Sequence, residues 1–219
     1  MAGLQKIRTL FSSIPFLLSG LALILVVFLH FSMYLFLTLQ FVTLSVLLYL
    51  AYKNKNTRAR EHFLRTIRTG LLAGICATAG YDVIRLLIVN IFHFSIRPFD
   101  TFRFFGQIIL DRPVSDRMAY AVGFLYHMLN GITFSIAFFI VFNGRHWLYG
   151  ILWAFVLEVL MLIVYPRFLN VRSVMEEFTI VSCAGHTTYG VIIGLLNYHT
   201  FKKPKSINYA NSRQNVDIG

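Results

Sequence analysis

The amino-acid sequence of residues 14–52 is IPFLLSGLALILVVFLHFSMYLFLTLQFVTLSVLLYLAY, and it contains no Asp, Glu, Lys or Arg. A single α-helix of this length would measure about 58 Å, which is about twice the thickness of the hydrocarbon core of a bilayer. The stretch is therefore too long for one membrane crossing. A polar interruption at His30-Phe31-Ser32 lies near its middle, so we expect two transmembrane helices joined there by a tight turn.

The composition of the whole chain is also typical of a membrane protein. Of the 219 residues, 57% are hydrophobic and only 13% are charged, and the mean hydropathy is +0.67. Soluble domains are usually about 45–50% apolar and about 25% charged. These values exclude a disordered chain, a nucleic-acid-binding domain and an ordinary cytosolic enzyme. The net charge of +11 is better explained by basic loops on one side of a bilayer than by a nucleic-acid partner.

Further apolar segments predict an all-α polytopic membrane protein with about six transmembrane helices. Four segments follow the first two, at residues 70–92, 118–142, 147–165 and 178–201. We expect a transmembrane hairpin and a basic cytoplasmic linker in residues 1–69. Residues 70–201 would form a four-helix bundle with a polar site, and residues 202–219 a basic cytoplasmic tail.

The distribution of Lys and Arg predicts the orientation of the chain. With six crossings both termini lie on one side, and that side carries 13 Lys and Arg residues against 6 on the other side. Because cytoplasmic loops carry the excess of basic residues, we expect both termini in the cytoplasm. The mixed-charge loop at residues 93–117 would then lie at the outer interface.

Four ionisable side chains are predicted inside the bilayer: Asp82, His127, Glu158 and His186. Counted from the predicted cytoplasmic ends of their helices, all four lie about 17–22 Å deep at the rise of an α-helix. An ionisable group at this depth costs on the order of 2.5–3.5 kcal/mol, and it usually faces a protein interior. We therefore expect the four side chains to lie close together inside the C-terminal bundle.

The same four residues follow a weak internal repeat. His127 and His186 each begin a His-x-x-x-Gly pattern, and Asp82 and Glu158 each lie eight residues after a glycine. This spacing indicates a parallel repeat of two helices, and such repeats often carry a site at their interface.

Two carboxylates and two imidazoles suggest a metal site. Helix bundles commonly bind metals with carboxylates and histidines from facing helices, and this ligand set suits Zn²⁺, Fe²⁺ or Mn²⁺. We therefore predict Asp82, His127, Glu158 and His186 as ligands of a divalent transition metal. The bound cation would neutralise the two buried acids.

A site at this depth predicts a metal-dependent membrane enzyme that acts on a lipid or another apolar substrate. Arg85, Asn130 and Tyr189 lie within a turn of the predicted ligands and are the expected catalytic or orienting residues. Membrane lipid is the expected partner, and the sequence leaves a homo-oligomer open.

Other functions fit the same residues. Asp82 and Arg85 are three residues apart on one helix face and could form a structural ion pair, although this pair does not explain Glu158. Intramembrane acids and histidines also mark proton- or cation-coupled transporters. A non-catalytic membrane scaffold is the third alternative.

The segment Gly-Leu-Leu-Ala-Gly-Ile-Cys-Ala-Thr, which begins at Gly70, resembles part of the YagU-like proteins, as do the later His-x-x-x-Gly segments. These are small, uncharacterised bacterial inner-membrane proteins. The resemblance covers about 130 residues from Gly70 onward. It implies a multi-pass protein of the bacterial inner membrane and no particular activity.

Overall fold

The structure is a computed structural model that describes residues 2–53, 56–167, 169 and 172–202. Throughout this part of the chain the secondary structure is helical, without β-strands, and the predicted all-α fold is confirmed. The α-helices are α1 (Ala2–Leu29), α2 (Met33–Lys53), α3 (Thr57–Phe92), α4 (Asp100–Leu110), α5 (Asp116–Val141), α6 (Leu148–Val164) and α7 (Met175–Phe201). Two short 3₁₀ turns, Tyr165–Arg167 and Arg172–Val174, lie between α6 and α7.

The helices confirm a polytopic membrane protein. Among the described residues, α1, α2, α3, α5 and α7 are long and apolar enough to cross a membrane, judged by length and composition. Helix α6 coincides with the fifth predicted span but has only 17 residues. It is therefore about 25 Å long at the rise of an α-helix.

The first apolar stretch, residues 14–52, forms two helices that are separated at the predicted polar interruption. Helix α1 ends at Leu29, and α2 begins at Met33. His30 adopts a left-handed backbone conformation with φ of 56°, and its N–H donates to the carbonyl oxygen of Val26 at 3.1 Å. A left-handed residue is a common helix terminator, so a single residue ends α1 and starts the turn.

Most of the basic segment before the third span is helical and continuous with that span. Helix α3 has 36 residues and already begins at Thr57. The side chain of Asn56 accepts a hydrogen bond from the backbone N–H of Ala59 at 3.0 Å and caps the helix. Most of the predicted linker therefore forms the first turns of α3.

The loop at residues 93–117 contains a helix that the sequence did not predict. Helix α4 has 11 residues and buries Phe102 and Phe105. It packs tightly on α5, since a Cβ at Gly106 would collide with the carbonyl oxygen of Ala119. Asp111 ends α4 in a left-handed conformation with φ of 46°.

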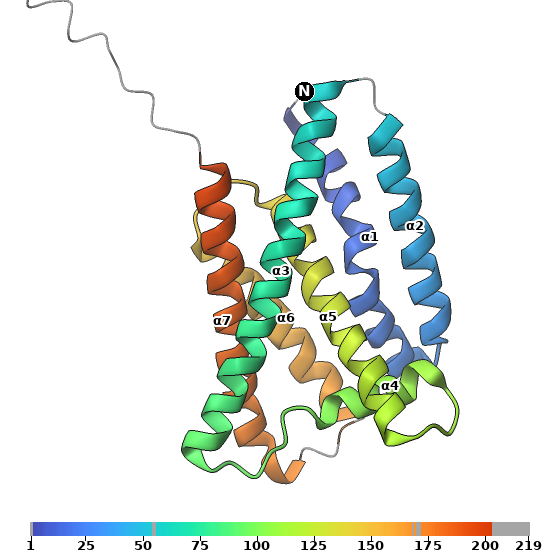
Figure 1. Ribbon diagram of the computed structural model, residues 1–219, viewed down its shortest axis with the longest axis vertical. Helices are drawn as coiled ribbons and strands as arrows, with labels where there is room; N and C mark the ends of the chain where they lie inside the picture. Colours follow the sequence, from blue (N-terminus) through green and yellow to red (C-terminus); the bar gives the residue numbers. More distant parts are fainter. Residues whose placement is uncertain (1, 54–55, 168, 170–171, 203–219) are drawn as a thin grey trace, which may run out of the picture.

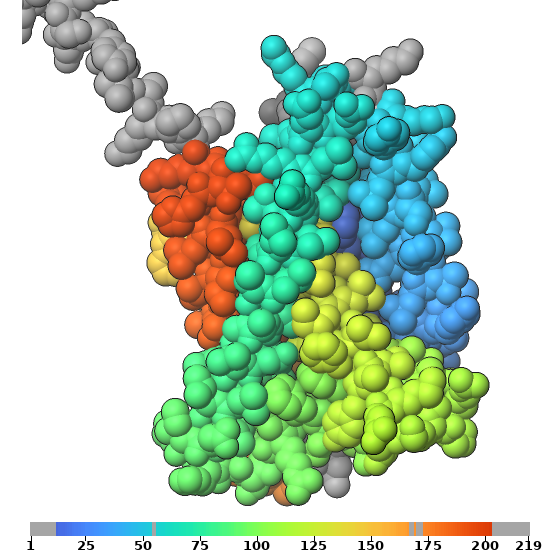
Figure 2. Space-filling view, viewed as in Figure 1, coloured from blue at the N-terminus to red at the C-terminus, as the bar shows by residue number. Residues whose placement is uncertain are grey.

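The helices pack as a bundle in which α3 lies between α5 and α7, and α6 packs on α7 (Figure 1). Helix α1 packs on α5, and α2 runs along one edge of the molecule (Figure 2). The start of α1 and the end of α7 lie at the same end of the bundle, whereas α4 lies at the opposite end (Figure 1). The predicted tail beyond Lys202 lies outside the described residues.

Helices α3, α5, α6 and α7 share the main core. Its fully buried side chains include Ala73, Ala77, Phe138, Phe139, Ala154 and Ile193. The backbones of α5 and α6 do not approach each other closely, unlike those of α3 and α5 or of α6 and α7. Near one end, the contact between the Trp153 and Phe142 rings connects α6 to the end of α5. The space left between α5 and α6 holds the site described next.

Candidate functional site

The first carboxylate–histidine pair joins α3 and α5. His127 Nε2 lies 3.1 Å from Asp82 Oδ2, and Arg85 Nη1 lies 3.6 Å from Asp82 Oδ1. Arg85 is buried, and its Nη2 donates to the carbonyl oxygen of Pro98 at 2.7 Å. Asp82 therefore has both the cation that the sequence spacing predicted and an imidazole as partners.

The second pair joins α6 and α7. His186 Nδ1 lies 2.6 Å from Glu158 Oε2, and Ser182 Oγ donates to the same oxygen at 2.5 Å. The thiol of Cys183 donates to Glu158 Oε1 at 3.4 Å. Glu158 is 2% exposed, and among the described residues no Lys or Arg forms an ion pair with it. Only an imidazole and neutral donors therefore surround this buried carboxylate.

The two pairs lie at equivalent positions of two helix crossings. A Cβ at Gly74 of α3 would lie 3.1 Å from the carbonyl oxygen of Gly131 in α5. A Cβ at Gly150 of α6 would collide with the carbonyl oxygen of Gly190 in α7. In both cases the acid lies eight residues after the first glycine and the histidine four residues before the second. The repeated spacing therefore produces the same contact twice.

The ring of Tyr81 lies between the two histidines. Its centroid is 5.7 Å from that of His127 and 5.0 Å from that of His186. The four predicted metal ligands thus come together as two pairs, one on each side of Tyr81. No group of three or more His, Cys, Asp or Glu side chains in the described ranges is arranged to hold a metal. The divalent metal site stays a prediction.

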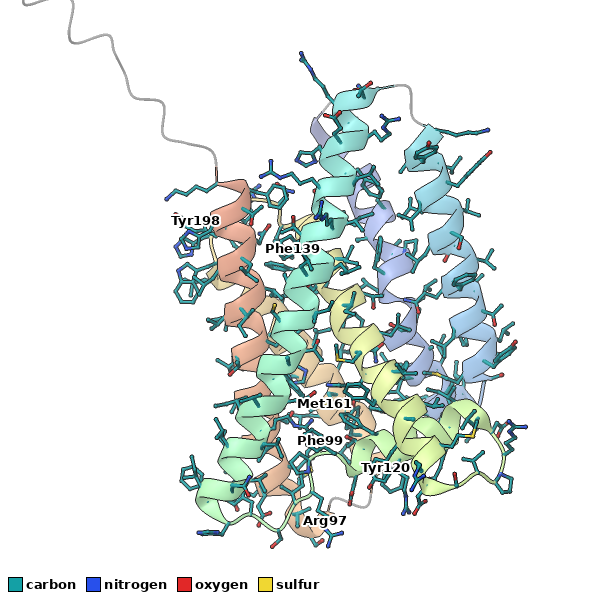
Figure 3. The ribbon with its side chains drawn as sticks, viewed as in Figure 1. Arg97, Phe99, Tyr120, Phe139, Met161 and Tyr198 are labelled. Atoms are coloured by element: carbon teal, nitrogen blue, oxygen red, sulfur yellow. The ribbon has the colours of Figure 1, made fainter. Side chains whose placement is uncertain are left out.

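A pocket of about 480 Å³ lies between α1, α5 and α6, next to both pairs. Its lining residues with polar side-chain atoms are Thr78, Tyr81, His127, Asn130, Trp153, Tyr165, His186 and Tyr189. Most of the other lining residues are apolar, and Met161 is one of them. Figure 3 labels Met161 in the same half of the bundle as Phe99 and Tyr120, and Phe139 of the core lies nearer the opposite end. This volume is sufficient for a small organic ligand.

The mouth of the pocket faces the side of the bundle. Four lining residues are also exposed on the outer surface: Ile14 and Leu21 of α1, and Val156 and Leu160 of α6, with exposed fractions of 41–52%. All four are apolar and belong to apolar helices. In a membrane this mouth would open toward lipid chains.

Two polar atoms of the pocket lining are buried without a hydrogen-bond partner among the described residues. They are Asn130 Oδ1, an acceptor, and Trp153 Nε1, a donor. Each such atom usually costs about 1–3 kcal/mol when it is left unpaired. By contrast, the Tyr189 hydroxyl in the same pocket already donates to the carbonyl oxygen of Gly131 at 2.6 Å. Asn130 and Trp153 are therefore available to a ligand.

The predicted catalytic residues do not share one environment. Asn130 and Tyr189 line the pocket, whereas Arg85 does not, because its guanidinium is held by Asp82, by Pro98 and over the Tyr81 ring. Sequence reasoning missed Tyr81, Trp153 and Ser182. Ser182 could have been found, because it lies one helical turn before His186 on the same face.

A second groove lies on the other side of the first pair, between α3, α4 and α5. Asp82 lines this groove together with Ile75, Phe102, Tyr120 and Phe124. His127, by contrast, lines the pocket. The contact between Asp82 and His127 therefore separates two cavities.

Comparisons with protein-family profiles, with curated proteins and with solved structures find no match for this chain. The resemblance to the YagU-like proteins stays a prediction.

Proposed function

We propose that the protein is an intramembrane enzyme that uses the Glu158–His186 pair for acid–base chemistry on a lipid-like molecule. The observation that carries this proposal is the position of His186, which contacts a buried carboxylate and also lines a pocket whose mouth faces the side of the bundle. The two parts of the proposal, the lipid-like ligand and the acid–base chemistry, rest on different contacts.

The mouth of the pocket supports a ligand that comes from the bilayer. Its exposed residues are apolar and belong to α1 and α6, so a water-soluble molecule has no polar path to the site on that side. A hydrocarbon chain would be in contact with apolar side chains along most of the pocket. Burial of such a chain is favourable by about 25 cal/mol for each Å² of apolar surface, relative to water.

The contacts of His186 support the acid–base role. A carboxylate that accepts the Nδ1–H of an imidazole fixes the tautomer and makes the other ring nitrogen more basic. The two contacts of His186, with Glu158 Oε2 and with the carbonyl oxygen of Ser182, both use Nδ1. Nε2 is therefore the nitrogen that can take up or release a proton at the polar end of a ligand.

For the membrane itself, we propose the inner membrane of a bacterium, with both chain termini in the cytoplasm. Support comes from the basic residues at the end of the bundle where α2 ends and α3 begins, which include Lys53, Arg58, Arg60 and Arg65. The end of α7 lies at the same end of the bundle (Figure 1). An excess of basic residues marks the cytoplasmic side.

The test combines lipid analysis with two matched variants. Wild-type protein purified in a mild detergent should retain lipid, identified by mass spectrometry after extraction. Val156→Trp places a large side chain in the mouth and should lower the retained lipid several-fold. Leu152→Trp, one turn earlier on the exposed face of α6 and outside the pocket lining, should not. Equal lipid retention in both variants would contradict a ligand in this pocket.

The acid–base role needs a separate measurement, because binding does not require it. Cells that overproduce the wild type should differ in lipid composition from cells that overproduce His186→Gln. The variant should fold and keep its bound lipid, since Gln can still accept and donate hydrogen bonds. Identical lipid profiles in the two strains, at equal protein levels, would contradict an enzyme.

Proton-coupled transport is a second candidate, favoured by one observation. The Asp82–His127 contact lies between the pocket and the groove lined by Asp82, so a proton on this pair could be exchanged with either cavity. Proton flux in proteoliposomes that is abolished in Asp82→Asn would favour transport over catalysis. An unchanged flux in that variant would exclude this pair as the pathway.

A further inference from the structure

The pocket contains polar groups but no formal charge of its own. Its lining residues, all within the described part of the chain, include no Asp, Glu, Lys or Arg. The carboxylate beside each histidine is negative or already paired with Arg85, and neutral imidazoles at His127 and His186 supply no cation. An anionic head group would therefore enter without a countercharge, and an unpaired ion in an apolar site is very unfavourable.

The polar atoms of the lining also have a defined hydrogen-bonding character. Because Nδ1 of His186 is directed to Glu158, the neutral imidazole offers Nε2 as an acceptor. Asn130 Oδ1 is a second acceptor, and Trp153 Nε1 is a donor, both buried and unpaired among the described residues. The ligand must therefore bring at least one donor for the acceptors and one acceptor for the indole N–H.

We infer that the ligand is a neutral lipid with a hydroxyl group, such as a long-chain alcohol or an acylglycerol. A hydroxyl supplies one donor and two acceptor positions, and it carries no charge. This inference rests on the proposed function, because it specifies the molecule that the pocket binds. It excludes phospholipids and fatty-acid anions as the preferred ligands, because their head groups are ionic.

The experiment uses the fluorescence of Trp153 in full-length protein that carries Trp147→Phe, reconstituted in phosphatidylcholine nanodiscs. Three probes share one dibrominated acyl chain, which quenches indole fluorescence on contact. They are the monoacylglycerol, the methyl ester, which lacks a donor, and the free acid at pH 8. The measured quantity is the mole fraction of probe that gives half-maximal quenching.

The monoacylglycerol should reach half-maximal quenching at a mole fraction about tenfold lower than the methyl ester. Tenfold corresponds to about 1.4 kcal/mol, which is near the upper end of the net strength of one hydrogen bond. Asn130→Leu removes the unpaired acceptor and should reduce this preference to about threefold or less. Asn90→Leu is the matched control, because Asn90 is exposed on α3 and its side chain donates to the carbonyl oxygen of Leu86. It should keep the full preference.

The outcomes separate this inference from the proposed function. If the monoacylglycerol and the methyl ester quench equally, or if the free acid quenches best, the hydroxyl inference is overturned while lipid binding in the pocket stands. If Asn130→Leu keeps the full preference, the hydroxyl is recognised elsewhere and the inference is also overturned. If no probe quenches Trp153 more than its random distribution in the nanodisc predicts, the pocket holds no lipid and the proposed function itself fails.

Discussion

The two carboxylate–histidine pairs have the same spacing and different surroundings. Asp82 has the buried guanidinium of Arg85 as a second partner, and Arg85 is tied to the loop before α4 through Pro98. The partners of Glu158 in the described part of the chain are His186, Ser182 and Cys183. The first pair is therefore balanced by a permanent cation, whereas the second has no such cation among the described residues. The first pair is therefore suited to stabilising the fold, and the second is suited to proton transfer.

The largest effect should come from removing the permanent cation. Arg85→Met leaves the partly buried Asp82 without its permanent cation and should lower the free energy of unfolding by about 3–5 kcal/mol. Denaturant titration of the purified protein measures this loss. Arg103→Met is the control, because the exposed pair between Arg103 and Asp116 should contribute only about 0–1 kcal/mol. Equal losses in the two variants would contradict a stabilising role for Arg85.

A smaller loss is expected when the hydroxyl beside Glu158 is removed. Ser182→Ala deletes a hydrogen bond to a buried charged group, which is worth about 1.5–3 kcal/mol. Thr187→Val deletes a hydroxyl that only donates to the carbonyl oxygen of Cys183 in its own helix, and its effect should be close to zero. Thermal unfolding of both variants at the same pH compares them. If Thr187→Val loses as much thermal stability as Ser182→Ala, the loss does not come from the hydrogen bond to Glu158, and this prediction is wrong.

The ring of Tyr81, which lies between the two pairs, should contribute less to the free energy of unfolding than the Ser182 hydroxyl does. Tyr81→Leu removes the contact with the Arg85 guanidinium, 4.9 Å from the ring centroid, and both contacts with the histidine rings. The expected loss is about 1–2 kcal/mol. Tyr81→Phe keeps the ring and should retain most of the stability. If Tyr81→Phe loses as much as Tyr81→Leu, the hydroxyl and not the ring is responsible.

Metal analysis tests whether the two pairs bind one metal ion together. For this prediction no change in stability is expected. If the pairs act separately, purified protein should not contain one equivalent of Zn, Fe or Mn that depends on both pairs. Elemental analysis of the wild type, Asp82→Asn and His186→Gln measures this. One equivalent of metal in the wild type that is lost in both variants would support the predicted four-ligand site. It would contradict separate roles for the two pairs.

Sequence reasoning predicted the order of the apolar helices because the lengths of the apolar segments match what a membrane crossing requires. The break after Leu29 could also be predicted, because the apolar stretch is too long for a single membrane crossing. Helix α4 was missed because its 11 residues are aromatic and mixed in charge, and only their packing on α5 stabilises them as a helix.

The partners within the site were harder to predict than its residues. Spacing along a helix places Asp82 and His127 at one depth, but it does not give the rotation of each helix about its own axis. That rotation is set by the glycine crossings, where Gly150 and Gly190 bring two backbones into contact. It determines that the acids pair with the histidines within each helix pair, and that Tyr81 separates the pairs.

The short length of α6 has a consequence for the bilayer around the protein. A helix of 17 residues spans about 25 Å, whereas a typical hydrocarbon core is about 30 Å thick. Thinning of the bilayer next to such a helix is one way in which this mismatch is accommodated. Val156 and Leu160 of α6 also form the mouth of the pocket, so the thinned region of the bilayer would lie at the entrance of the proposed ligand. Membrane thickness would therefore control the rate of loading, with thin bilayers filling the pocket faster than thick ones.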